Sequence, residues 1–274
     1  MRLAVDHVTT YRYAQPVRGV VQSHRLTPSL CDGQRVEAWA VAVSEGVRGG
    51  AFRDGAGDWI EAWTVRGPVS EIVVTVRGVV ETVDMAGVLR GQRECVPPLA
   101  WLRETPATRA DAEMVALAQS VSAPDVLGLA HGLAATVAEA IAYAPGATEA
   151  QTTAAEAVAL GQGVCQDHAH ALIALARTRG LPARYVSGYL LAAEAGAAQE
   201  AAHAWAELWV EGLGWVGFDA ANRCCPDARY IRLGCGFDAR DAAPIRGIAR
   251  GAAGETMTVS VSVQPAASQQ QQQQ

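Results

Sequence analysis

The chain has 274 residues, half of them hydrophobic, and its 22 basic and 28 acidic residues give a net charge of -6. This length allows one or two domains with a sizeable core. The charge balance argues against a nucleic-acid-binding protein, which needs a basic stripe or patch.

The first residues, MRLAVDHVTTYRYAQ, alternate apolar and polar side chains and lack the apolar h-region of a signal peptide. The alanine-rich stretches further along do not approach a charge-free transmembrane span. We therefore expect a cytoplasmic protein with no membrane partner. Most of its six cysteines should then be free thiols, because a chain of this length needs no disulfide framework.

Residues 1–85 carry the period-2 patterns and the β-branched and aromatic side chains that are typical of strands. Turn signals such as LCDGQ and RDGAGD separate them. Strands are predicted over residues 3–13, 36–43, 59–67 and 71–83. Several short strands in a row predict an N-terminal antiparallel β-sandwich. Residues 86–105 lack periodicity, contain Pro97-Pro98, and are interpreted as a linker.

Residues 106–265 change to helical patterns and then return to strands. Helices are predicted over residues 108–121, 123–144, 153–160 and 165–179. Asp125 is the expected N-cap of the second helix, Thr153 and Glu156 form a capping box at the start of the third, and Gly180 ends the fourth. Strands are predicted over 183–192, 202–211, 214–222 and 255–264, the second and third forming a hairpin about EGLG. The fold class is therefore α+β. Residues 266–274, AASQQQQQQ, should be disordered because a polar tract buries too little surface.

The stretch GQGVCQDHAHALIALARTRG places Cys165 between a glycine-rich lead-in and the first turn of a predicted helix. The free amides and the dipole of a helix N-terminus stabilise an anion, and the thiolate is the reactive form of cysteine. A nucleophilic cysteine also needs a base and a group that orients the base. His203 and Asp219 lie on the two strands of the predicted hairpin, which would bring them roughly opposite each other.

Three stretches, GVCQDHAHALIALARTRGLPARYVSGYL, AHAWAELWV and GWVGFDAAN, resemble the three catalytic blocks of the bacterial transglutaminase-like superfamily. The resemblance implies a papain-like core of helices packed on an antiparallel sheet. It implies Cys165 as the nucleophile, His203 as the base and Asp219 as its orienting group. YRYAQPV and RLTPS resemble, less specifically, the β-rich N-terminal domain that often precedes this core.

Two positions depart from the usual pattern of the superfamily. His168 stands where an aromatic residue is usual, and Ala220 stands where the family usually has a proline, as in DPTN. The second change could loosen the loop that follows Asp219, but it leaves the three implied catalytic residues in place.

The implied reaction is acyl transfer from a peptide or protein amide to Cys165 through a thioester, with no cofactor. Water would resolve the thioester in a peptidase or amidase, and a primary amine would resolve it in a transglutaminase. The Cys165 backbone amide is a natural oxyanion donor at a helix start, and Gln162 or the similarly placed Gln166 could add a second donor. The alternative is a non-catalytic peptide-binding protein that retains the fold, which the intact set of three residues argues against.

The other histidines and cysteines near these blocks are expected to have structural roles. Cys165, His168 and His203 offer an alternative interpretation as a metal site. A zinc site needs three or four suitably placed ligands, however, and the sequence has no second clear pair of ligand residues. We expect His170 to be a packed residue bonded to the backbone and His168 to lie in the cleft or on the surface. Adjacent cysteines are not a CxxC motif, so idle thiols are expected at Cys224, Cys225 and Cys235.

Overall fold

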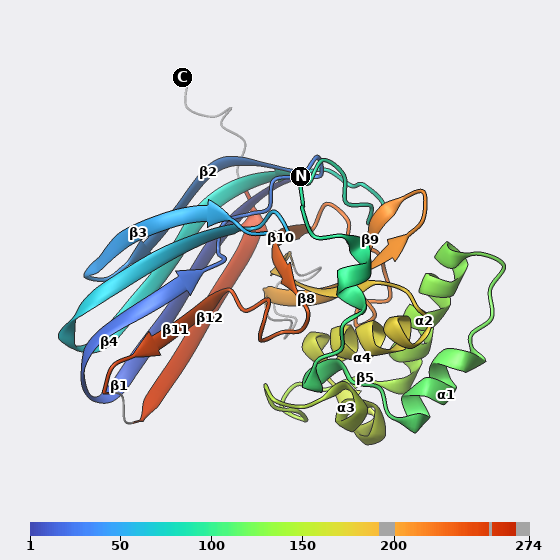
Figure 1. Ribbon diagram of the computed structural model, residues 1–274. Helices are drawn as coiled ribbons and strands as arrows, with labels where there is room; N and C mark the ends of the chain where they lie inside the picture. Colours follow the sequence, from blue (N-terminus) through green and yellow to red (C-terminus); the bar gives the residue numbers. More distant parts are fainter. Residues whose placement is uncertain (192–200, 252–253, 267–274) are drawn as a thin grey trace, which may run out of the picture.

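The computed structural model describes residues 1–191, 201–251 and 254–266. It consists of a large curled antiparallel sheet and, beside it, a smaller sheet covered by helices (Figure 1). Most of the tail predicted to be disordered lies outside the described residues. Among the described residues, no helix combines the length and the apolar character that crossing a bilayer requires.

The large sheet is built around two long strands that lie side by side. Its strands are β1 (Arg2–His24), β2 (Gln34–Val43), β3 (Gly46–Arg53), β4 (Trp59–Thr82), β11 (Ile245–Ala249) and β12 (Glu255–Pro265). β1 and β4 pair along most of their length. β12 and β2 flank one half of this pair, and β11 and β3 flank the other half.

The predicted sandwich is not confirmed, because the described residues of this region form one curled sheet. The register between β1 and β4 shifts between Arg12 and Gly19, where the pair bends. A buried cluster that includes Tyr11, Trp63 and Ile72 fills the inside of the curl. The sequence pattern describes β4 as two strands, since Gly67-Pro68 has the composition of a turn.

The last predicted strand forms as β12, but it pairs with β1 rather than with the strands of the second half. β11, which the sequence did not predict, pairs with β1 as well. The chain therefore returns to the first sheet after building the second part. Alternating residues specify that a strand forms, but the partner of a strand is a non-local choice.

The second part contains the predicted helices and a four-stranded sheet. The helices are α1 (Ala112–Ser120), α2 (Val126–Ala140), α3 (Ala154–Leu160) and α4 (Cys165–Thr178), with 3-10 turns η1 (Pro98–Leu102) and η2 (Pro106–Thr108) before them. The sheet has the order β10-β7-β8-β9, from β7 (Ala183–Leu190), β8 (Ala202–Val210), β9 (Gly214–Phe218) and β10 (Tyr230–Gly236). Two short strands, β5 (Ala142–Tyr143) and β6 (Gln162–Gly163), pair in parallel. The α+β class is confirmed.

α4 is the central element of this part. It packs against β7, β8 and the other three helices, and every residue from 167 to 177 is buried. A helix that is apolar on several faces belongs in the centre of a core. The predicted caps are confirmed, since Asp125 accepts the amide of Gly128 at 2.7 Å and Thr153 forms a capping box with Glu156.

The predicted linker contributes to the second part. The Leu89 amide donates to the Trp215 carbonyl at 2.9 Å, and the Gly217 amide donates to the Gly87 carbonyl at 2.8 Å. Trp101, from η1, is buried in the same cluster as Trp205 and Trp215. These tryptophans cover one face of the sheet, while a separate cluster holds the alanines of β8 against α4.

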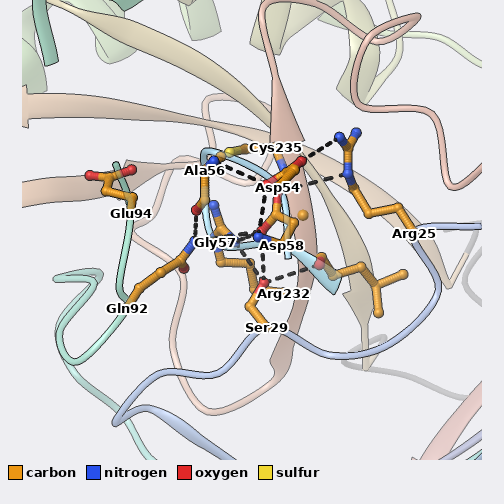
Figure 2. A network of polar contacts seen from close by, with 12 residues as sticks. Arg25, Ser29, Asp54, Ala56, Gly57, Asp58, Gln92, Glu94, Arg232 and Cys235 are labelled. Atoms are coloured by element: carbon orange, nitrogen blue, oxygen red, sulfur yellow. Dashed lines mark hydrogen bonds and ion pairs between the residues drawn. The ribbon is translucent and has the colours of Figure 1, made fainter. Parts of the chain in front are cut away.

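Buried ion pairs join the two parts of the molecule. Asp58, from the turn before β4, is fully buried and pairs with Arg232 of β10 at 2.9 Å. Arg25, which follows β1, lies on the other side of Asp58 (Figure 2). Arg232 also pairs with Glu207 of β8 at 2.8 Å. The first sheet is therefore tied to the strands that carry the candidate site.

Candidate active site

Cys165 is the first residue of α4, as predicted. The chain enters this helix from α3 through Gly161, whose φ of 68° is the left-handed conformation that glycine adopts readily. Asp167 then fixes the start of α4: its Oδ2 accepts the Val164 amide at 2.8 Å and the Thr148 hydroxyl at 2.6 Å. Cys165 itself is half-buried. A helix N-terminus with an acidic cap therefore presents this thiol at the edge of the core.

The β8–β9 hairpin brings His203 and Asp219 together. Because Ala206 pairs with Phe218, the strand register leaves positions 203 and 219 close to each other at the end of the hairpin. His203 Nε2 lies 2.6 Å from Asp219 Oδ2, and the two side chains are only 7% and 1% exposed. Cys165 is also close enough to raise the pKa of His203. The structure thus brings the three predicted side chains together.

Their charges are coupled. Burial alone would lower the pKa of His203, but the hydrogen bonds and charges of Asp219 and Cys165 outweigh it and raise this pKa to about 10. For Asp219, burial acts to raise the pKa, yet the contact with His203 and further hydrogen bonds lower it. His203 is therefore held beside a carboxylate that favours its protonated form and close to the sulfur of Cys165. This is the arrangement that a base and its orienting group require.

Two more residues surround Asp219, and neither was predicted. Asn222 donates its backbone amide to Oδ1 at 3.1 Å and its side-chain amide to Oδ2 at 2.7 Å. Tyr230 donates its hydroxyl to Oδ2 at 2.8 Å. The position of Asn222, three residues after Asp219 in the third block, could have indicated its contact with Asp219 from the sequence. Tyr230 starts β10, which no sequence pattern predicted.

The residues considered as oxyanion donors lie around the start of α4. Cys165 is the first helical residue, where backbone amides lack an intrahelical acceptor. Gln162 is exposed and lies on β6, which pairs with β5. The side-chain amide of Gln166 donates to the Ala150 carbonyl at 3.2 Å. Which of these donors serves an oxyanion stays a prediction.

His168 and His170 are both buried, so the expectation of a cleft or surface position for His168 is wrong. The ring nitrogens of His168 bond to the carbonyl oxygens of Val164 and Ile141, each at 2.9 Å. Both nitrogens are therefore engaged, which is incompatible with His168 as a metal ligand. His170 Nε2 accepts the Ala239 amide at 3.0 Å, and the expected backbone bond of a packed histidine is confirmed.

The described residues contain no cluster of three or more His, Cys, Asp or Glu side chains that could hold a metal ion. All six cysteines are free thiols. Burial raises the pKa of Cys224 and Cys225, and it raises that of Cys235 to about 12. These thiols are therefore poorer nucleophiles at neutral pH than an exposed cysteine.

A pocket of about 530 Å³ adjoins the N-terminal half of α4. Its lining includes Gln166 and His170 from the helix, and Asp238 and Arg240 from the segment that follows β10. Gln166 follows Cys165 in the chain, but Cys165, His203 and Asp219 are not among the residues that line this pocket. Its volume is in the range of small-molecule binding sites.

Comparisons with known proteins concern both parts of the chain. Residues 115–220 match the transglutaminase-like superfamily, and residues 3–81 match the bacterial transglutaminase-like N-terminal region. An uncharacterized protein of Mycobacterium leprae is 29% identical, with 96% of this chain and 98% of the relative covered. An uncharacterized protein of Mycobacterium tuberculosis is 28% identical over 90% of this chain and 87% of its own length.

A proposed cysteine protease of Cytophaga hutchinsonii has a similar crystal structure, with a TM-score of 0.75. It is 20% identical in sequence, and the match covers 98% of this chain and 91% of that chain. At this identity the likeness concerns the fold, and it extends over both parts of the molecule. The chain belongs to the transglutaminase-like superfamily and carries that superfamily's bacterial N-terminal region.

Proposed function

We propose that this protein is a cysteine-dependent enzyme that acts on amide bonds in peptides or proteins. The observation that carries the proposal is the position of His203, which is hydrogen-bonded to Asp219 and close enough to Cys165 to be affected by its charge. A nucleophile, a base and a group that orients the base are the minimum set for covalent acyl transfer.

In the proposed reaction, the sulfur of Cys165 attacks the amide carbonyl carbon while His203 holds the thiol proton. The carbon–nitrogen bond breaks, His203 gives its proton to the leaving amine, and a thioester remains on Cys165. Water or a primary amine, deprotonated by His203, then attacks the thioester and releases Cys165 as a thiol. Asp219 keeps the imidazole oriented and stabilises its charged form through both halves of the cycle.

Hydrolysis and amine transfer use the same residues and differ only in the second nucleophile. Casein incubated with a fluorescent primary amine separates them. Incorporation of the amine into casein indicates transfer, whereas release of shorter peptides without incorporation indicates a peptidase. Both products must disappear in Cys165→Ala if they arise from the proposed thioester.

The site itself is tested by the rate of iodoacetamide labelling, followed by mass spectrometry of the modified cysteine. Because Cys95 is exposed, all variants carry Cys95→Ser to remove background labelling. We expect rapid labelling of Cys165 at about pH 6, well below the pKa of about 8.5 of a free thiol, and at least about a tenfold loss in His203→Ala. His131→Ala, which removes an exposed histidine, is the matched control.

Slow labelling spread over several thiols and unaffected by His203→Ala would overturn the proposal. The same fold would then be interpreted as a peptide-binding protein without catalysis, since a fold by itself does not fix an activity.

A further inference from the structure

Tyr230 reaches the candidate site from the edge strand of the second sheet. It is the first residue of β10, its side chain is buried, and its hydroxyl lies 2.8 Å from Asp219 Oδ2. The same oxygen receives His203 Nε2 at 2.6 Å. Tyr230 and His203 therefore share one carboxylate oxygen.

The direction of these hydrogen bonds follows from counting protons. An ionised carboxylate only accepts, so the single hydroxyl proton of Tyr230 goes to Asp219. Cys224 Sγ lies 3.3 Å from the same hydroxyl oxygen. With the tyrosine proton already committed, the thiol of Cys224 is the donor of this contact. The hydroxyl of Tyr230 is thus held on both sides, by Cys224 and by Asp219.

Packing holds the tyrosine ring as well. Its centroid lies 5.9 Å from that of His203 with an interplanar angle of 60°, and 5.5 Å from that of Trp205 with an angle of 85°. Both are edge-to-face arrangements, which are favourable for aromatic pairs. A ring fixed in this way presents its hydroxyl to Asp219 in one orientation.

We propose that Tyr230 is a positioning residue of this site: its hydroxyl fixes the Asp219 oxygen that orients His203 toward Cys165. The inference rests on the proposed function and extends it to a residue outside the three catalytic blocks. Asn222 supports the same carboxylate from the loop after β9, so Asp219 is held from two different elements.

A consequence for pH follows from the same contacts. Burial acts to raise the pKa of Asp219, and hydrogen bonds from His203, Asn222 and Tyr230 lower it. Removing the Tyr230 hydroxyl therefore makes Asp219 easier to protonate, and a protonated Asp219 no longer stabilises an imidazolium. The other titratable group against the Tyr230 hydroxyl is Cys224, with the Asp227–Arg229 ion pair beyond it.

The test compares Tyr230→Phe with Tyr189→Phe in the Cys95→Ser background. Tyr189 is a matched control because it is also buried and its hydroxyl also makes a 2.8 Å hydrogen bond, to His7 Nδ1 in the first sheet. The readout is the iodoacetamide labelling rate of Cys165 across pH. We expect Tyr230→Phe to slow labelling by about tenfold and to move the acidic limb of the profile to higher pH, since a hydrogen bond to a charged group is lost. Tyr189→Phe should leave both unchanged.

If Tyr230→Phe does not fold, Cys224→Ala provides the second measurement. It keeps the tyrosine and removes the thiol that fixes its hydroxyl, so we expect a smaller shift of the acidic limb in the same direction. Cys225→Ala, one residue further along, is its control and should superimpose on the parent protein.

A Tyr230→Phe or Cys224→Ala profile that superimposes on the parent profile would overturn the inference while leaving the proposed function intact. If the parent protein shows no labelling of Cys165 that depends on His203, the proposed function fails. The inference then falls with it, because Tyr230 would have no base to position. The two failures are therefore distinguishable.

Discussion

The backbone at Gly163 lies against the side chain of Asp167: a Cβ added at Gly163 would sit 2.7 Å from both Cβ and Oδ2 of Asp167. That oxygen is the one that accepts the Val164 amide and the Thr148 hydroxyl at the start of α4. The glycine two residues before Cys165 thus has a structural reason. It lets the acidic side chain at the start of α4 close against the chain that enters the helix.

The first prediction concerns Gly163→Ala. The added methyl group must displace Asp167, so we expect a loss of about 1–3 kcal/mol in the free energy of unfolding. Slower labelling of Cys165 should accompany it, because the helix start that presents the thiol is disturbed. Urea unfolding and iodoacetamide kinetics measure the two effects. Gly50→Ala is the control, since a Cβ there has nothing within 4 Å. Equal midpoints for the two variants would contradict the prediction.

The second prediction concerns stability at alkaline pH. The pKa of His203 is about 10 in the folded protein, against about 6.5 for an unperturbed histidine. The stabilisation from protonated His203 is therefore fully present below pH 6.5 and is lost as the pH rises through about 10. Urea unfolding of the parent protein and of His203→Gln across this window should give a difference in stability that shrinks with rising pH.

His170 should contribute to stability with the opposite dependence on pH. Burial lowers its pKa to about 4, so its contribution is present above about pH 6.5, the pKa of an unperturbed histidine, and is lost as the pH falls toward about 4. The stability difference between the parent protein and His170→Gln should therefore shrink on acidification. If both differences stayed constant over pH, the assigned charge states of these histidines would be wrong.

How far the sequence predicts this molecule depends on whether a feature is local. The capping box of Thr153 and Glu156 spans four residues, and it was predicted and found. The meeting of Cys165 with His203 and Asp219 was also predictable, because a short hairpin joins two of them and the family blocks contain all three. β3 was missed because its residues, GVRGGAFR, carry glycines and charges that weaken a strand pattern.

Features that depend on distant pairing could not be predicted. β10 contains Arg232, and a buried arginine hides the apolar pattern of a strand unless its partners Asp58 and Glu207 are known. The same reason hides Tyr230, whose contact with Asp219 exists only once β10 has paired with β7.

The third prediction concerns Asp58→Asn. Asp58 is fully buried between Arg232 and Arg25, so its neutralisation removes one of the carboxylates that pair with each guanidinium. Glu207 still pairs with Arg232 and Asp54 with Arg25. We expect a loss of about 1.5–3 kcal/mol in the free energy of unfolding, measured in urea, as for a hydrogen bond to a charged group. Asp6→Asn is the control: the Asp6–Arg77 pair is largely exposed, and exposed pairs contribute about 0–1 kcal/mol. Similar small losses in both variants would mean that the buried network does not hold the two parts together.

The last prediction concerns His168→Phe, which places an aromatic residue at a position where this chain has a histidine. Each ring nitrogen of His168 lies 2.9 Å from a carbonyl oxygen, one of Val164 and one of Ile141, and the ring thereby links the start of α4 to the residue that ends α2. Phenylalanine fills similar space but has no polar atom to meet these carbonyl groups. The Val164 carbonyl keeps two backbone amides, whereas the Ile141 carbonyl loses its side-chain partner, and a buried unsatisfied group costs about 1–3 kcal/mol.

We therefore expect His168→Phe to lose about 1–3 kcal/mol of unfolding free energy, with slower labelling of Cys165 because the helix start is less well held. His131→Phe, on the exposed face of α2, should change the unfolding midpoint little. A His168→Phe variant as stable as the parent protein would mean that packing at this position outweighs its hydrogen bonds. An aromatic residue could then replace His168 without loss, and the histidine would have no special role in presenting Cys165.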